Sequence, residues 1–286
     1  MGEVMPRPIK RLAGHWLLPV ILLCGGSALV DARPRALLAK PRRIVSLNLC
    51  ADQYLIALAD PGQITALTRF SRDPAMSAAA DAAQRLPQTK GNAEDVVALD
   101  PDLVIASPGR RSATMSALAR QHYPTLELKS AKSYADIVAQ VREVAAAVGH
   151  PERGEALIRR MDAELAALPR PRKRGVAAYY QRRGFLTGTG TLIDDLMKRV
   201  GLTNLAGKIG KPVLSRLTIE QLIVASPDYL LVETATDHVT DQGTEMLHHP
   251  ALAGIPRLKL PQAWTVCGGP AYVRAAQSLS QQLNAR

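Results

Sequence analysis

An internal repeat constrains the fold more than any other feature of this sequence. Glu94 precedes a Pro-Asp pair and the apolar run at 101–105 by seven positions, and Glu220 precedes a second Pro-Asp pair and apolar run at 227–231 by the same seven. Each copy has the order expected of a helix that leads into a β-strand. Alternating helices and strands build parallel sheets covered by helices, so the repeat predicts two α/β lobes.

Strands and helices can be placed around this repeat. Short apolar runs predict strands that end at Leu47, Leu67, Ala106, Tyr180 and Val232. Between positions 133 and 168 the apolar spacing becomes helical, with a break at 149–151, and Ser133 and Asp136 have the spacing of a capping box. A proline-rich basic run at 169–174 then precedes a new strand. Because the working loops of parallel sheets lie at the carboxyl ends of the strands, we expect a cleft lined by those loops.

The first 32 residues have the pattern of an export signal. Arg7, Lys10 and Arg11 form a basic head, 17–23 is an apolar run broken by Pro19, and 30–32 supplies a cleavage site. We therefore predict a signal peptide at 1–32 and a periplasmic location for the remainder. Two less favoured alternatives stay open: the uncharged stretch 12–30 could remain as a membrane anchor, or Cys24 could carry a lipid.

The formal charge of +11 raises the question of nucleic-acid binding. The basic residues are spread along the chain, aromatic residues make up 4%, and no zinc-finger, RNP or helix-turn-helix spacing is present. We expect a generally basic exported protein with no nucleic-acid partner.

From about Arg43 to the end, the chain resembles the periplasmic substrate-binding proteins of ABC importers, of the class III type that takes up cobalamin and ferric siderophores. The matching segments are 43–47, 91–94, 101–106, the helical region, 218–222 and 227–228. The resemblance implies an α/β fold of two Rossmann-like lobes with parallel sheets, at 43–148 and 171–286, joined by a single long helix at 149–170. It also implies that the chain is no enzyme and has no intrinsic cofactor.

The resemblance implies a partner as well as a ligand. The ligand would be a metal chelate, either a corrinoid such as cobalamin or a ferric siderophore, and the partner an ABC permease with its ATPase in the inner membrane. An acidic residue on each lobe docks onto the permease in that family, and the matching positions are Glu94 and Glu220. The competing interpretation is that these are ordinary helix-start glutamates, which the helix dipole favours. We expect a monomer.

The predicted strand ends place a set of polar, aromatic and cysteine residues along the cleft: Asn48, Cys50, Arg69, Phe70, Arg72, Arg110, Tyr180, Gln181, Arg183 and Glu233. Arginine suits the oxygens of an anionic chelate because its planar group donates paired hydrogen bonds. Trp264 and Tyr272 lie in the segment that reaches into the cleft of the resembled proteins. For Trp264 we leave two interpretations open, stacking on the ligand or closing the core.

Two cysteines follow the predicted cleavage site, Cys50 and Cys267. In an oxidising compartment such a pair favours a disulfide, although the bond would join the two lobes. Unpaired thiols are the second interpretation and soft metal ligands a distant third. We predict no metal site.

Other functions have less support. A haem-binding protein of the same family would need an axial ligand such as Tyr180 or a histidine. A thiol-dependent enzyme or a hydrolase lacks a C-x-x-C pair, a G-x-S-x-G elbow or an H-E-x-x-H helix. The loop at 187–191 has no lysine in P-loop register, and Thr191 and Asp194 have capping-box spacing instead. His238, His248 and His249 share one polar stretch, which indicates a surface loop.

Overall fold

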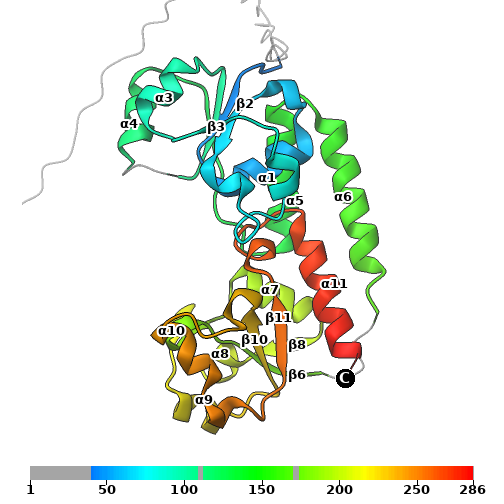
Figure 1. The fold of residues 1–286 in the computed structure, drawn as a ribbon. Coiled ribbons are helices and arrows are strands. Elements are labelled where there is room, and N and C mark those ends of the chain that lie inside the picture. The colour runs from blue at the N-terminus through cyan, green and yellow to red at the C-terminus, as the bar shows by residue number, and fades with distance from the viewer. Residues whose placement is uncertain (1–39, 109–111, 170–173, 286) are drawn as a thin grey trace, which may run out of the picture. The chain divides into compact units, whose positions relative to one another are not determined.

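The computed structural model describes residues 40–108, 112–169 and 174–285. The predicted signal peptide at 1–32 and Arg110 therefore lie outside the described residues. Figure 1 shows the arrangement of helices and strands. Among the helices of the described part, none combines the length and the apolar character needed to cross a membrane.

Two parallel sheets form the framework. The first has the strand order β3-β2-β1-β4-β5, with β1 at Ile44–Ser46, β2 at Ile64–Thr68, β3 at Gln88–Thr89, β4 at Leu103–Ala106 and β5 at Thr125–Glu127. The second has the order β11-β10-β6-β8, with β6 at Gly175–Tyr179, β8 at Leu202–Asn204, β10 at Tyr229–Glu233 and β11 at Arg257–Leu260. A short antiparallel pair adds β7 at Phe185–Thr187 and β9 at Leu214–Arg216. The predicted α/β fold with parallel sheets is confirmed.

The helices alternate with these strands along the chain. Before the second sheet come α1 at Leu49–Leu58, α2 at Ala80–Ala83, α3 at Ala93–Ala98, α4 at Ala113–Arg120, α5 at Tyr134–Ala147 and α6 at Pro151–Ala166. The remaining helices follow β6, the first strand of the second sheet along the chain. They are α7 at Leu192–Arg199, α8 at Leu205–Lys208, α9 at Ile219–Ala225, α10 at Gln242–Glu245 and α11 at Ala271–Asn284. The helix α6 thus lies between the last strand of the first sheet and the first strand of the second, where the sequence places the linking helix.

The break between α5 and α6 has a local cause. Gly149 follows the end of α5 with φ +79°, a conformation that glycine adopts without strain. Its N–H donates to Ala146 O at 3.2 Å, and the N–H of His150 donates to Ala145 O at 2.8 Å. These two bonds make a Schellman cap, and Pro151 begins the next helix at a position where no N–H is needed.

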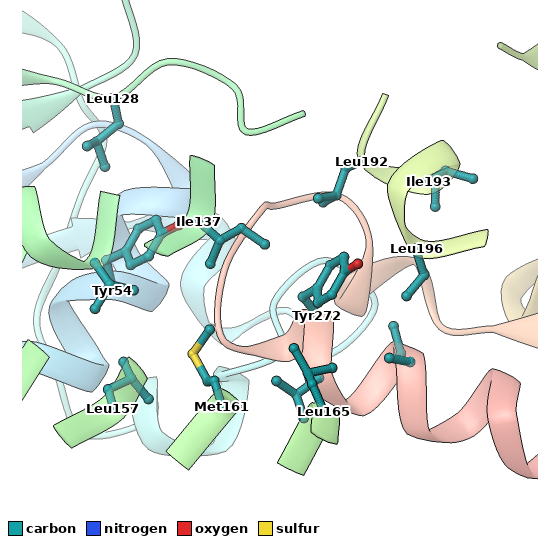
Figure 2. Packing of buried hydrophobic residues seen from close by; sticks show 14 of the residues in the cluster. Tyr54, Leu128, Ile137, Leu157, Met161, Leu165, Leu192, Ile193, Leu196 and Tyr272 are labelled. Carbon is teal, nitrogen blue, oxygen red and sulfur yellow. The ribbon is translucent and has the colours of Figure 1, made fainter. Parts of the chain in front are cut away.

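Both faces of each sheet are buried, because alternate residues of a strand point to opposite faces. In β1, Ile44 packs into the largest core cluster while Val45 packs into a separate cluster with Val104. In β6, Ala177 belongs to the largest cluster and Ala178 to a third. The largest cluster also includes residues of α1, α5, α6, α7 and α11, so one hydrophobic core is continuous between the two sheets (Figure 2).

The sequence repeat corresponds to one repeated backbone contact. The Asp102 carboxylate accepts hydrogen bonds from the N–H groups of Arg42 and Arg43 at 2.7 and 2.9 Å, just before β1. In the second lobe, the Asp228 carboxylate accepts from the N–H of Val176 in β6 at 2.7 Å. In both lobes the Pro-Asp pair therefore satisfies donors at the start of the neighbouring strand, which gives the repeat a physical reason.

Candidate functional site

A pocket of about 690 Å³ lies at the carboxyl ends of β1, β2 and β4. It has the size of a small-molecule site, for which roughly 300–1,000 Å³ is typical. Its walls combine apolar and hydroxyl-bearing side chains with two cations, and they are formed by Ser46, Leu47, Asn48, Leu49, Thr68, Arg69, Phe70, Met76, Thr89, Lys90, Gly91, Ala106, Ser107, Pro108, Ser112, Thr114 and Met115. We call it the N-lobe pocket. Three predicted site residues line it, namely Asn48, Arg69 and Phe70.

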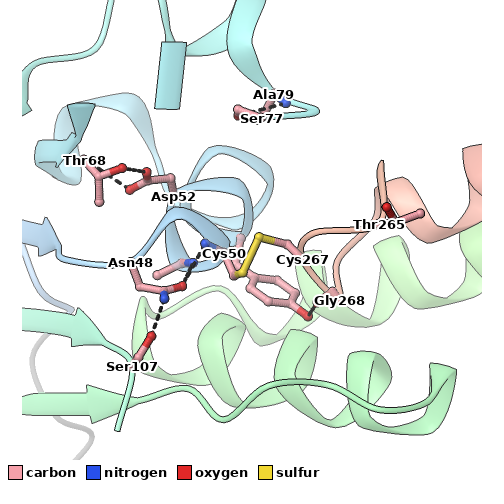
Figure 3. The surroundings of a disulfide bond; sticks show 12 residues. Asn48, Cys50, Asp52, Thr68, Ser77, Ala79, Ser107, Thr265, Cys267 and Gly268 are labelled. Carbon is pink, nitrogen blue, oxygen red and sulfur yellow. Dashed lines mark hydrogen bonds between the residues drawn. A yellow bond between two sulfur atoms is a disulfide. The ribbon is translucent and has the colours of Figure 1, made fainter. Parts of the chain in front are cut away.

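Asn48 joins the loop after β1 to the end of β4. Its Oδ1 accepts hydrogen bonds from the N–H groups of Cys50 and Ala51 at 2.8 and 3.1 Å, so it caps α1. Its Nδ2 donates to Ser107 Oγ, which follows β4 (Figure 3). Because both amide atoms have internal partners, Asn48 shapes the pocket wall more than it supplies free hydrogen-bonding groups.

Arg69 and Phe70 form an exposed pair on the pocket wall. Both belong to the 3₁₀ turn Arg69–Arg72 that follows β2, and the guanidinium carbon of Arg69 lies 4.6 Å from the centroid of the Phe70 ring. Phe70 is 41% exposed, which is unusual for a large aromatic side chain without a partner surface. This pair offers an apolar face and a cation side by side.

Asp52 fixes the end of β2 beneath this pair. Its carboxylate accepts from the N–H of Thr68 at 3.1 Å and from the Thr68 hydroxyl at 2.5 Å, and its side chain is fully buried. Burial raises the pKa of the Asp52 carboxyl, and the hydrogen bonds from Ser46 and Thr68 oppose that rise. Asp52 therefore positions the strand end rather than contacting the pocket.

A second pocket of about 380 Å³ lies at the carboxyl ends of β6 and β10. We call it the C-lobe pocket; it is lined by Gln181, Arg182, Phe185, Leu214, Glu233 and Gln262. Of the predicted residues, Gln181 and Glu233 lie here. Glu233 Oε1 accepts from the Tyr179 hydroxyl at 2.7 Å and from Gln181 Nε2 at 3.4 Å. Burial, together with the Glu233 charge, raises the pKa of Tyr179, which keeps it a hydrogen-bond donor.

Four of the residues predicted to contact the ligand have other partners in the structure, so the prediction is corrected for them. Tyr180 is fully buried and donates to Leu217 O at 2.8 Å, because the alternation of β6 turns it into the core; burial raises its pKa to about 12. Tyr272 is 1% exposed and donates to Asp195 Oδ2. The Arg72 guanidinium turns away from the N-lobe pocket and donates to Ala83 O and Leu86 O. The fourth, Cys50, has its sulfur in a disulfide.

The disulfide joins Cys50 to Cys267 across 217 residues of sequence, with a Cα–Cα distance of 5.2 Å. Figure 3 shows the bond beside α1, where the loop before α11 meets the first lobe. The Tyr54 hydroxyl donates to Gly268 O at the same place. The structure thus has the disulfide, which is the interpretation that the sequence favours for this pair of cysteines.

Two further predicted residues lie away from both pockets. Trp264 is half-buried and packs against the largest core cluster, in the 3₁₀ turn Gln262–Trp264. Arg183 is exposed, has φ +58°, and lines a smaller pocket of about 370 Å³ that also includes Glu220 and Arg216. A left-handed arginine is sparsely populated, so the β6–β7 connection imposes this conformation.

The two predicted docking residues occupy equivalent positions. Glu94 lies in the first turn of α3, which Asn92 caps, and Glu220 lies in the first turn of α9, which Thr218 caps. Both carboxylates are exposed. Hydrogen bonding from Thr218 lowers the pKa of Glu220, so it stays ionised at neutral pH. Glu94 and Glu220 thus occupy the same position, the second residue of the helix, at the starts of α3 and α9.

The family model for periplasmic binding proteins matches residues 44–259, which include most of both sheets. The chain belongs to the periplasmic binding protein family.

The similar proteins include vitamin B12-binding proteins and a heme-binding protein. The vitamin B12-binding protein of Pectobacterium atrosepticum is 26% identical over 262 residues, which are 86% of this chain and 89% of that protein. Among solved structures, the periplasmic heme-binding protein of Roseiflexus has a TM-score of 0.68 at 24% identity, covering 85% of this chain and 98% of its own. The vitamin B12 binding protein of Vibrio cholerae has a TM-score of 0.62 at 17% identity, with 86% and 98% covered. The structural likeness shows a shared fold.

The sequence interpretation of this periplasmic binding protein missed three residues. Lys90 lines the N-lobe pocket directly after β3, a two-residue strand too short to be recognised from apolar spacing. Arg182 and Gln262 line the C-lobe pocket. Arg182 is adjacent to predicted residues on both sides, so its position after β6 was the available signal. For Gln262 the sequence contains no such signal, because its position depends on how the segment before α11 folds back.

Proposed function

We propose that this chain is the extracytoplasmic solute-binding component of an ABC importer, which captures a metal chelate, a corrinoid or a ferric siderophore, and delivers it to a permease. The observation that carries the ligand class is the composition of the N-lobe pocket. Arg69 and Lys90 line it, and no aspartate or glutamate is among its described lining residues. Such a pocket favours an anionic or acceptor-rich ligand.

The aromatic side chain in the same wall supports a large flat ligand. Phe70 exposes its ring beside the Arg69 guanidinium, so an apolar macrocycle or a catechol ring could pack there while its oxygens contact the cation. The names of the similar vitamin B12-binding proteins support a corrinoid in particular.

A haem ligand has less support in the site. Haem-binding proteins hold iron through side chains such as tyrosine or histidine. Neither residue type is among the described lining residues of the N-lobe or C-lobe pocket. Tyr179 is the last residue of β6 and Tyr180 follows it, and their hydroxyls donate hydrogen bonds to the Glu233 carboxylate and to Leu217 O. Haem therefore enters the test as the competing outcome.

The delivery step rests on the two acidic residues. Glu94 and Glu220 are exposed at equivalent helix starts of the two lobes. A pair of separated carboxylates fixes orientation and raises the encounter rate with a basic surface. We propose that they contact the permease, that the chain acts in the periplasm after removal of residues 1–32, and that it is monomeric there.

The test is a fluorescence titration of residues 33–286, in which Trp264 is the single tryptophan. The probes are cobalamin, haemin and several ferric siderophores, with correction for their absorbance. We expect saturable quenching by cobalamin or a siderophore, weakened roughly tenfold in Phe70→Ala and Lys90→Gln. The matched control is Arg85→Gln, an exposed cation outside the pocket. Saturation by haemin alone, or by no chelate, would refute the proposed ligand class.

A further inference from the structure

A third pocket, of about 440 Å³, lies away from the strand ends, between α1, α6 and α11. We call it the helix pocket. Its lining residues are Gln53, Ile56, Ala57, Ala78, Ala79, Leu157, Arg160, Met161, Glu164, Pro270, Ala271, Val273 and Arg274. None of these lines the N-lobe or C-lobe pocket. We propose that the helix pocket binds a small amphipathic anion, with an apolar body and one carboxylate.

The apolar part of this proposal comes from the walls. Aliphatic or methionine side chains enter the pocket from α1, α6 and α11, among them Ile56, Met161 and Val273. Figure 2 shows Leu157 and Met161 along the face of α6 that is turned toward the core. The pocket therefore combines aliphatic walls with polar groups, and its volume lies in the range of small-molecule sites.

One buried polar group in this wall lacks a partner. Gln53 is 4% exposed, and its Nε2 has no hydrogen-bond partner among the described residues. A buried donor left unpaired destabilises the folded protein, because it has lost its hydrogen bonds to water. Rotation of the terminal amide would present this donor to the pocket, where a ligand oxygen could accept from it. An occupant with an acceptor oxygen would satisfy this donor after that rotation.

The charges at the pocket favour an anion. Arg160, Arg274 and Glu164 line it, which leaves one net positive charge. Glu164 has two neighbours already, Arg160 at 3.9 Å and Gln277 Nε2 at 3.4 Å. Arg274 is exposed and has no ion-pair partner in the part of the chain that the structure describes. An arginine with free donors beside an apolar pocket fits a carboxylate headgroup.

The helix pocket lies between helices that follow strands of two different sheets. The walls come from α1, which follows the first strand of one sheet, and from α11, which follows the last strand of the other. A bound molecule would contact both elements at once, on residues separate from the two strand-end pockets. The proposal thus does not depend on which chelate the strand-end pockets bind.

The test uses octanoate as the probe, titrated into the purified protein by calorimetry, with octanol as the uncharged control of equal length. We expect saturable octanoate binding that is weakened roughly tenfold, or about 1.4 kcal/mol, in Arg274→Gln. Gln53→Met should weaken it as well, because this change keeps the shape and removes the donor. Octanol should bind more weakly than octanoate, and added salt should reduce the difference.

Two control variants locate the binding. Arg159→Gln removes an exposed cation of α6 outside the pocket, and Phe70→Ala alters the N-lobe pocket; both should leave octanoate binding unchanged. Circular dichroism of each variant checks folding, and Arg274→Gln, being an exposed change, keeps the test decisive if Gln53→Met unfolds. Absence of saturation up to about 10 mM octanoate would overturn the proposal. Equal affinity in Arg274→Gln, or loss in Phe70→Ala, would overturn it too.

Discussion

Cys50, in the first turn of α1, is bonded to Cys267, in the loop that leads into α11. This bond joins a helix of the first lobe to the segment that precedes the last helix of the second. The same segment is held by the hydrogen bond from the Tyr54 hydroxyl to Gly268 O. The lobes are therefore connected at a point far from α6 in the sequence.

Removal of the disulfide should destabilise the protein. In the double variant Cys50→Ser, Cys267→Ser, we expect the free energy of unfolding to fall by about 2–4 kcal/mol, because the cross-link restricts the unfolded chain. Urea unfolding with and without dithiothreitol measures this change. Reductant should destabilise the natural protein and leave the double variant unaffected. Two titratable thiols in the oxidised, exported protein would contradict the prediction.

The close approach at Gly268 should not tolerate a methyl group. A Cβ at Gly268 would lie 2.2 Å from Cβ of Ala131, whereas a Cβ at Gly269 would meet nothing within 4 Å. Gly268→Ala should therefore reduce stability by about 1–3 kcal/mol, as overpacking does. Gly269→Ala is the adjacent control and should have little effect in the same denaturant titration. Equal stability of the two variants would show that the segment moves freely.

The Tyr272 hydroxyl connects α11 to α7 through Asp195, and the same carboxylate Oδ2 accepts from the N–H of Tyr134 at 3.2 Å. Arg199 Nε donates to the Tyr272 oxygen at 3.0 Å. Tyr272→Phe should reduce stability by about 1–3 kcal/mol, since it removes hydrogen bonds to charged groups. Tyr123→Phe serves as the control in thermal unfolding and should change little. An unchanged midpoint for Tyr272→Phe would refute this role.

The Asp60 carboxylate should make the free energy of unfolding decrease as the pH becomes acidic. Hydrogen bonds from Lys40 and Arg153 hold the pKa of Asp60 well below its ordinary value of 3.8, and His150 adds to the effect. A lowered folded-state pKa means that the unfolded chain takes up protons first as the pH falls below about 4. The stabilisation is therefore present at neutral pH and is lost on acidification.

The measurement is urea unfolding of the natural protein and of Asp60→Asn at pH 7 and pH 3. We expect Asp60→Asn to be less stable at pH 7, with a smaller difference from the natural protein at pH 3. The control is Asp81→Asn, an exposed aspartate on α2. A difference that is constant with pH would show that the Asp60 charge makes no contribution.

Charge reversal at the proposed docking residues should affect delivery and not capture. We expect Glu94→Arg and Glu220→Arg each to reduce transport by roughly tenfold, since they replace attraction by repulsion at the permease. Chelate affinity by fluorescence should be unchanged. The control is Glu152→Arg, because Glu152 is also an exposed glutamate in the first turn of a helix, α6. Similar transport by all three variants would favour the ordinary helix-start interpretation.

The sequence by itself predicted five of the strands, the helical region at 133–168 and the order in which they follow one another. Helix caps such as Ser133 and Thr191, the glycine break at 149 and the alternation of apolar residues depend on neighbours a few positions apart, and the structure has them where the sequence predicts them. The repeated Pro-Asp pairs indicated two related lobes because each acts at the start of a strand in its own sheet.

Only the tertiary structure decided which side chains face a pocket. Tyr180 is next to Gln181, which lines the C-lobe pocket, but neighbouring residues of an extended chain point to opposite sides. Tyr180 therefore lies in the core, where its hydroxyl donates to Leu217 O. Arg72 and Arg69 share one turn, yet backbone carbonyls 11 and 14 residues further along the chain take the Arg72 guanidinium. The sequence favours a bond between Cys50 and Cys267, but only the fold brings their Cα atoms to 5.2 Å across 217 residues of sequence. These contacts depend on how distant segments pack, which local spacing in a single sequence does not encode.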